Sequence, residues 1–155
     1  MDTSRCCRCR LIDTRPSFSF FFSRSITFLC RVAALCGLLR CASAFARAFR
    51  EPDLLLLLAA DDPRRQNRYW PGAELVLEVI SPNDPARDGV RKRADYAQAG
   101  IPEYWIVDPD AETITVLALA GDAYVEHGAF GRGTVGTSPL LSKFAVPVNA
   151  VFDDA

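Results

Sequence analysis

The stretch ELVLEVISPNDPARDGVRKRADYAQAGIPEYWIVDP, residues 74–109, decides the fold of this chain. It opens with an apolar run, residues 74–80, which is typical of a β-strand although acids interrupt it. Side chains alternate across a strand, so the run has two distinct faces. One face carries Leu75, Leu77 and Val79, and the other carries Glu74, Val76, Glu78 and Ile80. The strand therefore combines a hydrophobic face with a face that holds two carboxylates.

A helix is expected after this strand. Asp84 is a favourable N-cap, Pro85 suits the first helical position, and Gly100 is typical of a helix end, which predicts a helix to about residue 99. Two lines of side chains run along it: a small apolar stripe of Val90, Ala94 and Ala97, and a second line of Asp88, Lys92, Tyr96 and Ala99. After Pro102, the run EYWIV at 103–107 reads as the next strand.

The flanking sequence adds further strands. The leucine run at 53–60 fits a strand that is buried on both faces. Residues 113–119 and 123–127 fit a hairpin that turns at Gly121-Asp122, and the tail at 138–152 predicts a short strand and loops. Strands, one helix and a hairpin in this order predict a mixed α/β (α+β) domain.

The first fifty residues differ sharply from the rest. They hold nine arginines, two aspartates and all six cysteines, a net charge of +7, whereas residues 51–155 hold nine Lys/Arg and 17 Asp/Glu, a net of −8. We therefore divide the chain into an atypical basic extension, 1–48, and a globular domain, 49–153. The acidic domain lacks the broad basic surface of a general nucleic-acid binder.

Several interpretations of the extension stay open. Its Arg- and Ser-rich composition fits a targeting leader, although arginines break every apolar run. The CxxC at Cys6–Cys9 has no second pair to complete a zinc site. A misassigned start or reading frame would also produce this composition, and residues 26–42 could instead form a helix on the domain. We expect a cytoplasmic protein without a membrane partner, with targeting as the alternative.

The acid within the strand suggests metal chemistry. Glu74 and Glu78 share a face, but four residues of strand separate them by about 13 Å, so one ion cannot easily bind both. Asp53, at the head of the preceding strand, is the better partner for Glu78. Two carboxylates with water and phosphate describe a Mg²⁺ site, and Lys92 could offset charge in a phosphoryl transition state. A strand cap at Asp53 and a structural Glu78–Lys92 salt bridge are the alternatives.

The same stretch resembles the Uma-two family of the PD-(D/E)xK, restriction-endonuclease-like superfamily. The resemblance rests on Pro52-Asp53, on Glu78-Val79-Ile80-Ser81-Pro82, on Lys92 with Tyr96, and on the run from Gly100 to Asp108, GIPEYWIVD. The late segment TSPLL, at 137–141, is also similar, so the resemblance covers about residues 49–153. It implies a restriction-endonuclease-like mixed β-sheet core with flanking helices, whose N-terminal helix and strand are missing or altered here.

The resemblance also implies a function. It suggests an endonuclease that hydrolyses DNA phosphodiester bonds, with Asp53 and Glu78 binding Mg²⁺ or Mn²⁺ and Lys92 as the catalytic lysine. Ser81 and Tyr96 are supporting residues in this scheme, whereas Glu103, Tyr104 and Trp105 belong to the core and the strand end. A homodimer is a further expectation. The alternative is an inactive, truncated member of the same fold that acts as a binding or interaction module.

Overall fold

The computed structural model describes residues 43–45, 48–50, 52–59, 61–64, 70–80 and 85–153. Three predicted features lie outside these residues: the cysteines, the helix at 26–42 and the N-cap at Asp84. Ser81 also lies outside them. Two short strands come first in the described part, β1 (Ser43–Phe45) and β2 (Ala48–Arg50), and they pair antiparallel.

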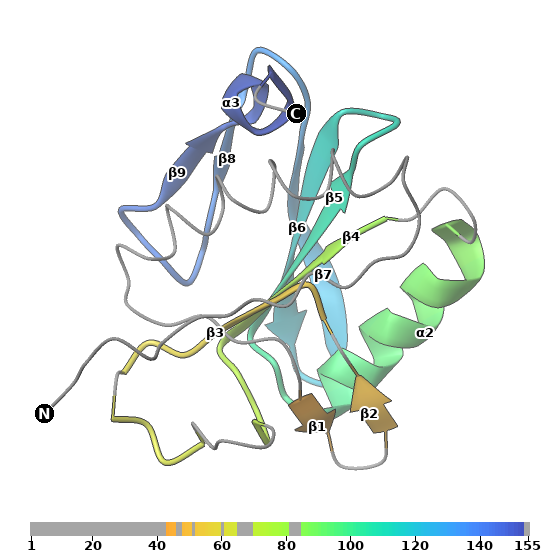
Figure 1. The fold of residues 1–155 in the computed structure, drawn as a ribbon, viewed down its shortest axis with the longest axis vertical. Helices are drawn as coiled ribbons and strands as arrows, with labels where there is room; N and C mark the ends of the chain where they lie inside the picture. Colours follow the sequence, from red (N-terminus) through yellow and green to blue (C-terminus); the bar gives the residue numbers. More distant parts are fainter. Residues whose placement is uncertain are drawn as a thin grey trace, which may run out of the picture.

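A five-stranded mixed sheet forms the centre of the domain (Figure 1). Its strands, in spatial order, are β3 (Leu54–Leu56), β4 (Leu75–Val79), β5 (Glu103–Asp108), β6 (Thr113–Ala120) and β7 (Ala123–Phe130). The β4 and β5 strands are parallel, and the other neighbours are antiparallel. A parallel pair needs a crossover, which α2 (Pro85–Gln98) provides. The strand–helix–strand prediction and the mixed fold class are therefore confirmed.

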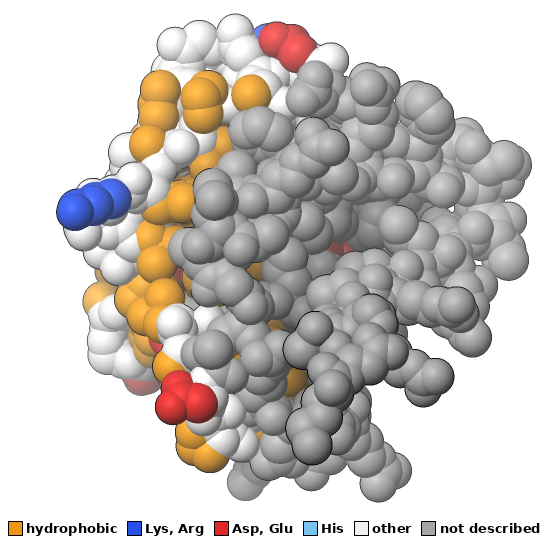
Figure 2. Space-filling model, turned by 60° about the vertical axis from the view of Figure 1, so that its left-hand side comes forward, with side chains coloured by type: hydrophobic (Ala, Val, Ile, Leu, Met, Phe, Trp, Pro, Cys, Tyr) orange, Lys and Arg blue, Asp and Glu red, His pale blue; other side chains and the backbone are white. Residues whose placement is uncertain are grey.

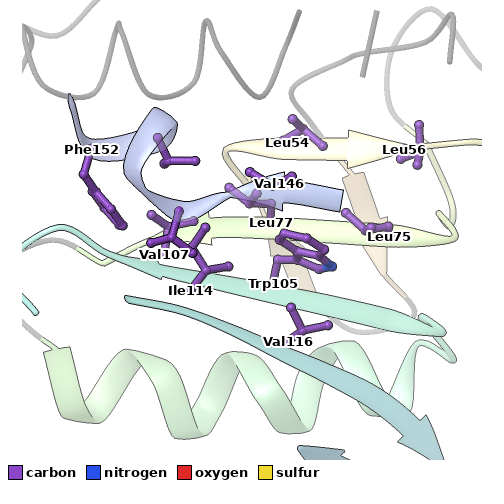
Figure 3. Packing of buried hydrophobic residues seen from close by; sticks show 12 residues of the cluster. Leu54, Leu56, Leu75, Leu77, Trp105, Val107, Ile114, Val116, Val146 and Phe152 are labelled. Carbon is purple, nitrogen blue, oxygen red and sulfur yellow. The ribbon is translucent and has the colours of Figure 1, made fainter. Parts of the chain in front are cut away.

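The two faces of the sheet have different covers. Side chains from β3 to β6 on one face pack against β9 (Ala145–Pro147) and α3 (Val148–Asp153), as Figure 3 shows, and α2 lies on the opposite side of the strands. The β9 strand pairs with β8 (Val135–Thr137) in a separate two-stranded sheet. The core on this face is made by twelve buried side chains: Leu54, Leu56, Leu75, Leu77, Trp105, Val107, Ile114, Val116, Val146, Val148, Val151 and Phe152.

The packing of the side chains along β4 confirms the two faces predicted for this strand. Leu75, Leu77 and Val79 belong to the cluster under α3, whereas Val76 and Ile80 belong to the cluster under α2. Because Glu78 has the same parity as Val76, it lies on the α2 side. The strand thus presents its acid to the helix that carries Lys92.

The helix α2 ends as predicted, and the structure shows which of its two lines of side chains packs against the sheet. Gly100 has φ +70°, its N–H bonds to the Ala97 carbonyl, and the Ile101 N–H bonds to the Tyr96 carbonyl, which together form a Schellman cap. In the apolar stripe, Val90 is 74 % exposed and Ala94 is also exposed, whereas Ala97 is buried. The sheet contacts the other line instead, because the large Tyr96 ring buries more apolar surface than valine or alanine.

Three predicted elements have different bounds. The leucine run forms only the short strand β3, since Leu58 is 50 % exposed, although Leu54 to Leu57 are buried as expected. The hairpin strand β7 continues to Phe130. The tail was expected to hold a short strand and loops, but it also forms the helix α3, whose Val148, Val151 and Phe152 are buried.

Glu103 links the C-terminal segment to the sheet. Its carboxylate is fully buried and accepts hydrogen bonds from Trp105 Nε1 (2.5 Å), Ser138 Oγ (3.0 Å) and Leu140 N (2.8 Å). A buried carboxylate is stable only when such donors replace water. Glu103 therefore has the structural place predicted for it, on the face away from α2.

Candidate active site

Two carboxylates meet where β3 begins and β4 ends. Leu54 pairs with Leu77 in the antiparallel register, so the next residues outward, Asp53 and Glu78, lie opposite each other. Residues directly opposite in an antiparallel pair have Cβ atoms about 5 Å apart and share a face. Asp53 Oδ2 also accepts a 2.7 Å hydrogen bond from Val79 N, which holds the acid against the end of β4.

Glu78 is the most constrained group of this site. It is only 5 % exposed, and both oxygens are engaged: Oε1 accepts from Tyr96 Oη at 2.5 Å, and Oε2 is 3.1 Å from Lys92 Nζ. Burial is the main cause that raises the pKa of Glu78 to about 7; the charge of Asp53 acts in the same direction, whereas Tyr96 and Lys92 lower the pKa. The carboxylate therefore titrates near neutral pH.

Asp53 has a similar electrostatic environment. Burial raises its pKa above the ordinary value, and the Val79 N–H and the Lys92 ammonium lower it. Lys92 therefore faces both acids, and its side chain is 22 % exposed. The structure thus brings the three predicted residues Asp53, Glu78 and Lys92 together, although 39 positions of sequence separate the first from the last.

Three tyrosines in successive ring contacts pack beside Glu78. The fully buried Tyr96 packs edge-on against Tyr104 with ring centroids 5.1 Å apart, and Tyr104 contacts Tyr124 at 5.8 Å. Tyr124 donates a 2.8 Å hydrogen bond to the Ile101 carbonyl. The sequence analysis assigned Tyr104 to the core and did not single out Tyr124. Alternation along residues 103–107 could have placed Tyr104 on the same side as Tyr96, but no local signal marked Tyr124.

Glu74 takes no part in the site, as its distance from Glu78 predicted. Its carboxylate accepts from Leu58 N at 3.1 Å and forms an ion pair with Arg64. Arg64 in turn pairs with Asp62. Glu74 therefore stabilises the connection that follows β3.

The donor set suits a hard divalent cation. No group of three or more His, Cys, Asp or Glu side chains converges among the described residues, so Asp53 and Glu78 are the acids available here. Mg²⁺ commonly takes one or two carboxylates and fills its other positions with water and phosphate oxygens. Burial is the main cause of the raised pKa values of both acids, and a bound cation would favour their ionised forms.

The family assignment follows from the sequence model of the Uma2 (Uma-two) family, described as "Putative restriction endonuclease", which matches residues 20–149. The chain belongs to the Uma-two family. Within the family pattern quoted above, Glu78 contacts Lys92 and Tyr96, and Asp53 lies opposite Glu78 on the neighbouring strand. The matched range begins inside the Arg- and Cys-rich segment.

A solved structure supports the Uma-two fold. The chain is similar to a crystal structure described as a putative nuclease belonging to DUF820 from Anabaena variabilis, with a TM-score of 0.67 and 16 % identity over 90 % of this chain and 82 % of that one. No protein with a curated description matches. Within the described residues, no helix is long and apolar enough to cross a membrane.

Proposed function

We propose that this chain is a metal-dependent endonuclease that hydrolyses phosphodiester bonds of DNA. The observation that carries the proposal is the meeting of Asp53 and Glu78 at the β3–β4 edge, with Lys92 Nζ 3.1 Å from Glu78. Membership of the Uma-two family supports a nuclease activity. Asp53 and Glu78 would hold Mg²⁺ or Mn²⁺. When bound, the ion would polarise the phosphate and acidify the attacking water.

The roles of the protein groups follow from their contacts. Tyr96 fixes Glu78 Oε1, so Oε2 is the oxygen that turns toward Lys92 and the site. A cation held by Glu78 would compete with Lys92 for that oxygen. Once released from Glu78, the Lys92 ammonium can face the phosphate and stabilise the negative charge that develops there. Lys92 is therefore a counter-ion in the ion pair described above and an electrophilic group during hydrolysis.

A cleavage assay tests this function. Supercoiled and linear DNA are incubated with the full chain in Mg²⁺, Mn²⁺ or EDTA, and strand breaks are quantified. We expect cleavage in either metal, none in EDTA, and a loss of at least about 100-fold in Asp53→Asn, Glu78→Gln and Lys92→Met. Glu74→Gln is the matched control, because it changes an acid on the same strand face that is paired with Arg64.

The inactive-module alternative predicts a different result. A non-catalytic member would show no cleavage and no rise in melting temperature on addition of Mg²⁺. A melting shift that disappears in Asp53→Asn, without strand breaks on any DNA, would support metal binding and refute the endonuclease.

A further inference from the structure

Among residues 85–153, most of the positive charge lies on the helix that carries Lys92. The helix α2 holds four cations, Arg87, Arg91, Lys92 and Arg93, against the two acids Asp88 and Asp95. Residues 99–155 hold two cations and eight acids. On the face shown in Figure 2, the described side chains are mostly hydrophobic, and charged groups are sparse. Among residues 85–155, α2 is therefore the element whose net charge most favours an anionic ligand.

Arg91 and Arg93 occupy the two borders of the buried face of α2. Successive residues turn by about 100°, so these two side chains point to opposite sides of the line that Lys92 directs at Glu78. Both are exposed, whereas Tyr96 on the Lys92 line is fully buried. The two arginines thus lie on either side of Lys92 on the surface of α2.

The pairing of the arginines separates them into two kinds. Arg64 and Arg132 are neutralised, the first by Asp62 and Glu74 and the second by Glu112 and Asp153. In the described part of the chain, neither Arg91 nor Arg93 forms an ion pair. A guanidinium without a carboxylate partner keeps its donors for a phosphate, which it binds in a bidentate way.

We propose that Arg91 and Arg93 form the surface that binds the sugar–phosphate backbone of the nucleic acid and holds it across Lys92. The inference rests on the proposed nuclease function and identifies the part of the surface that contacts the substrate. Contacts to phosphate position a nucleic acid without reading its sequence. The surface therefore contributes affinity and register, and it does so by local charge because the domain as a whole is acidic.

Binding can be measured without cleavage. A fluorescent 20-base-pair duplex is titrated with the full chain in Ca²⁺, and anisotropy is recorded over a series of KCl concentrations. Each phosphate contact contributes about 0.9 to the slope of log K against log salt. We expect Arg91→Gln and Arg93→Gln each to lower that slope by about 0.9, and the double variant by about 1.8. Lys143→Gln, which removes an equal charge from an exposed site outside α2, should leave the slope unchanged.

The following results decide between the outcomes. An unchanged slope in the double variant, or an equal loss in Lys143→Gln, would overturn it. Because both arginines are exposed, the variants should have unchanged melting curves, which shows that they fold. The double variant Arg91→Lys/Arg93→Lys keeps both charges and should therefore retain most of the slope. Cleavage by the wild type with an unaltered slope in the double variant would refute this surface alone. A slope that depends on Arg91 and Arg93 without any cleavage would refute the nuclease function alone.

Discussion

Glu78→Gln should remove a pH dependence of stability that arises in the candidate site. In the wild type, burial raises the pKa of Glu78 from 4.5 to about 7. Because one unit of pKa corresponds to about 1.4 kcal/mol, the shift amounts to about 3 kcal/mol between the protonated and ionised forms. Glu78 is only 5 % exposed, so solvent screening reduces this value little.

The sign follows from the direction of the shift. The folded chain binds the Glu78 proton more tightly than the unfolded chain does, so the stabilisation is fully present below pH 4.5 and is lost as the pH rises through about 7. The neutral amide of glutamine does not ionise, and it can still accept the Tyr96 hydrogen bond. The free energy of unfolding of Glu78→Gln should therefore fall less between pH 5 and pH 8, by about 3 kcal/mol.

Urea unfolding in EDTA at pH 5, 6, 7 and 8 measures this difference, because comparing variant and wild type cancels the titration of groups that do not interact with Glu78. Glu74→Gln, which removes the acid immediately before β4, serves as the control. In Mg²⁺, the wild type should regain stability at pH 8, since the metal binds the ionised carboxylate, and Glu78→Gln should not. A variant whose pH profile in EDTA runs parallel to that of the wild type would refute the assignment of a raised pKa to the buried Glu78 carboxyl.

The other predictions concern the groups around Glu78 and the end of α2. Tyr96→Phe should cost about 1.5–3 kcal/mol of unfolding free energy at pH 8, because it removes a buried hydrogen bond to a charged group. Tyr124→Phe, which removes a hydrogen bond to a backbone carbonyl, should cost about 1 kcal/mol, and equal losses for the two variants in urea titrations would contradict the difference. Lys92→Met should bind Mn²⁺ about fivefold more tightly by calorimetry, the equivalent of roughly 1 kcal/mol, because the substitution removes the ammonium that competes for Glu78 Oε2. Weaker binding would argue that Lys92 does not compete with the metal. Gly100→Ala should lower the free energy of unfolding by about 1–2 kcal/mol through the left-handed backbone alone, because no atom lies within 4 Å of the added Cβ. An unchanged melting temperature would show that alanine at this position is not strained.

Local rules in the sequence determined much of this domain. The alternation of residues 74–80 assigned Glu78 to the face of Val76, and the Pro85 and Gly100 signals bounded the helix. These features depend on neighbours a few residues apart, which the sequence shows directly. The same rules failed for α3, because a six-residue helix is marginal by itself and is stabilised by burying Val148, Val151 and Phe152 against the sheet.

Tertiary structure alone decided which groups meet. Helical periodicity offered two possible faces of α2, and the packing of Tyr96 against Tyr104 selected the one that points Lys92 at Glu78. Asp53 and Glu78 are 25 positions apart, and only the antiparallel register of β3 with β4 places them opposite each other. The sequence by itself determined that two acids and a lysine were available on suitable elements. The fold brought them together, because the hydrophobic cores on both faces of the sheet fix the strand register and the side of the helix that faces it.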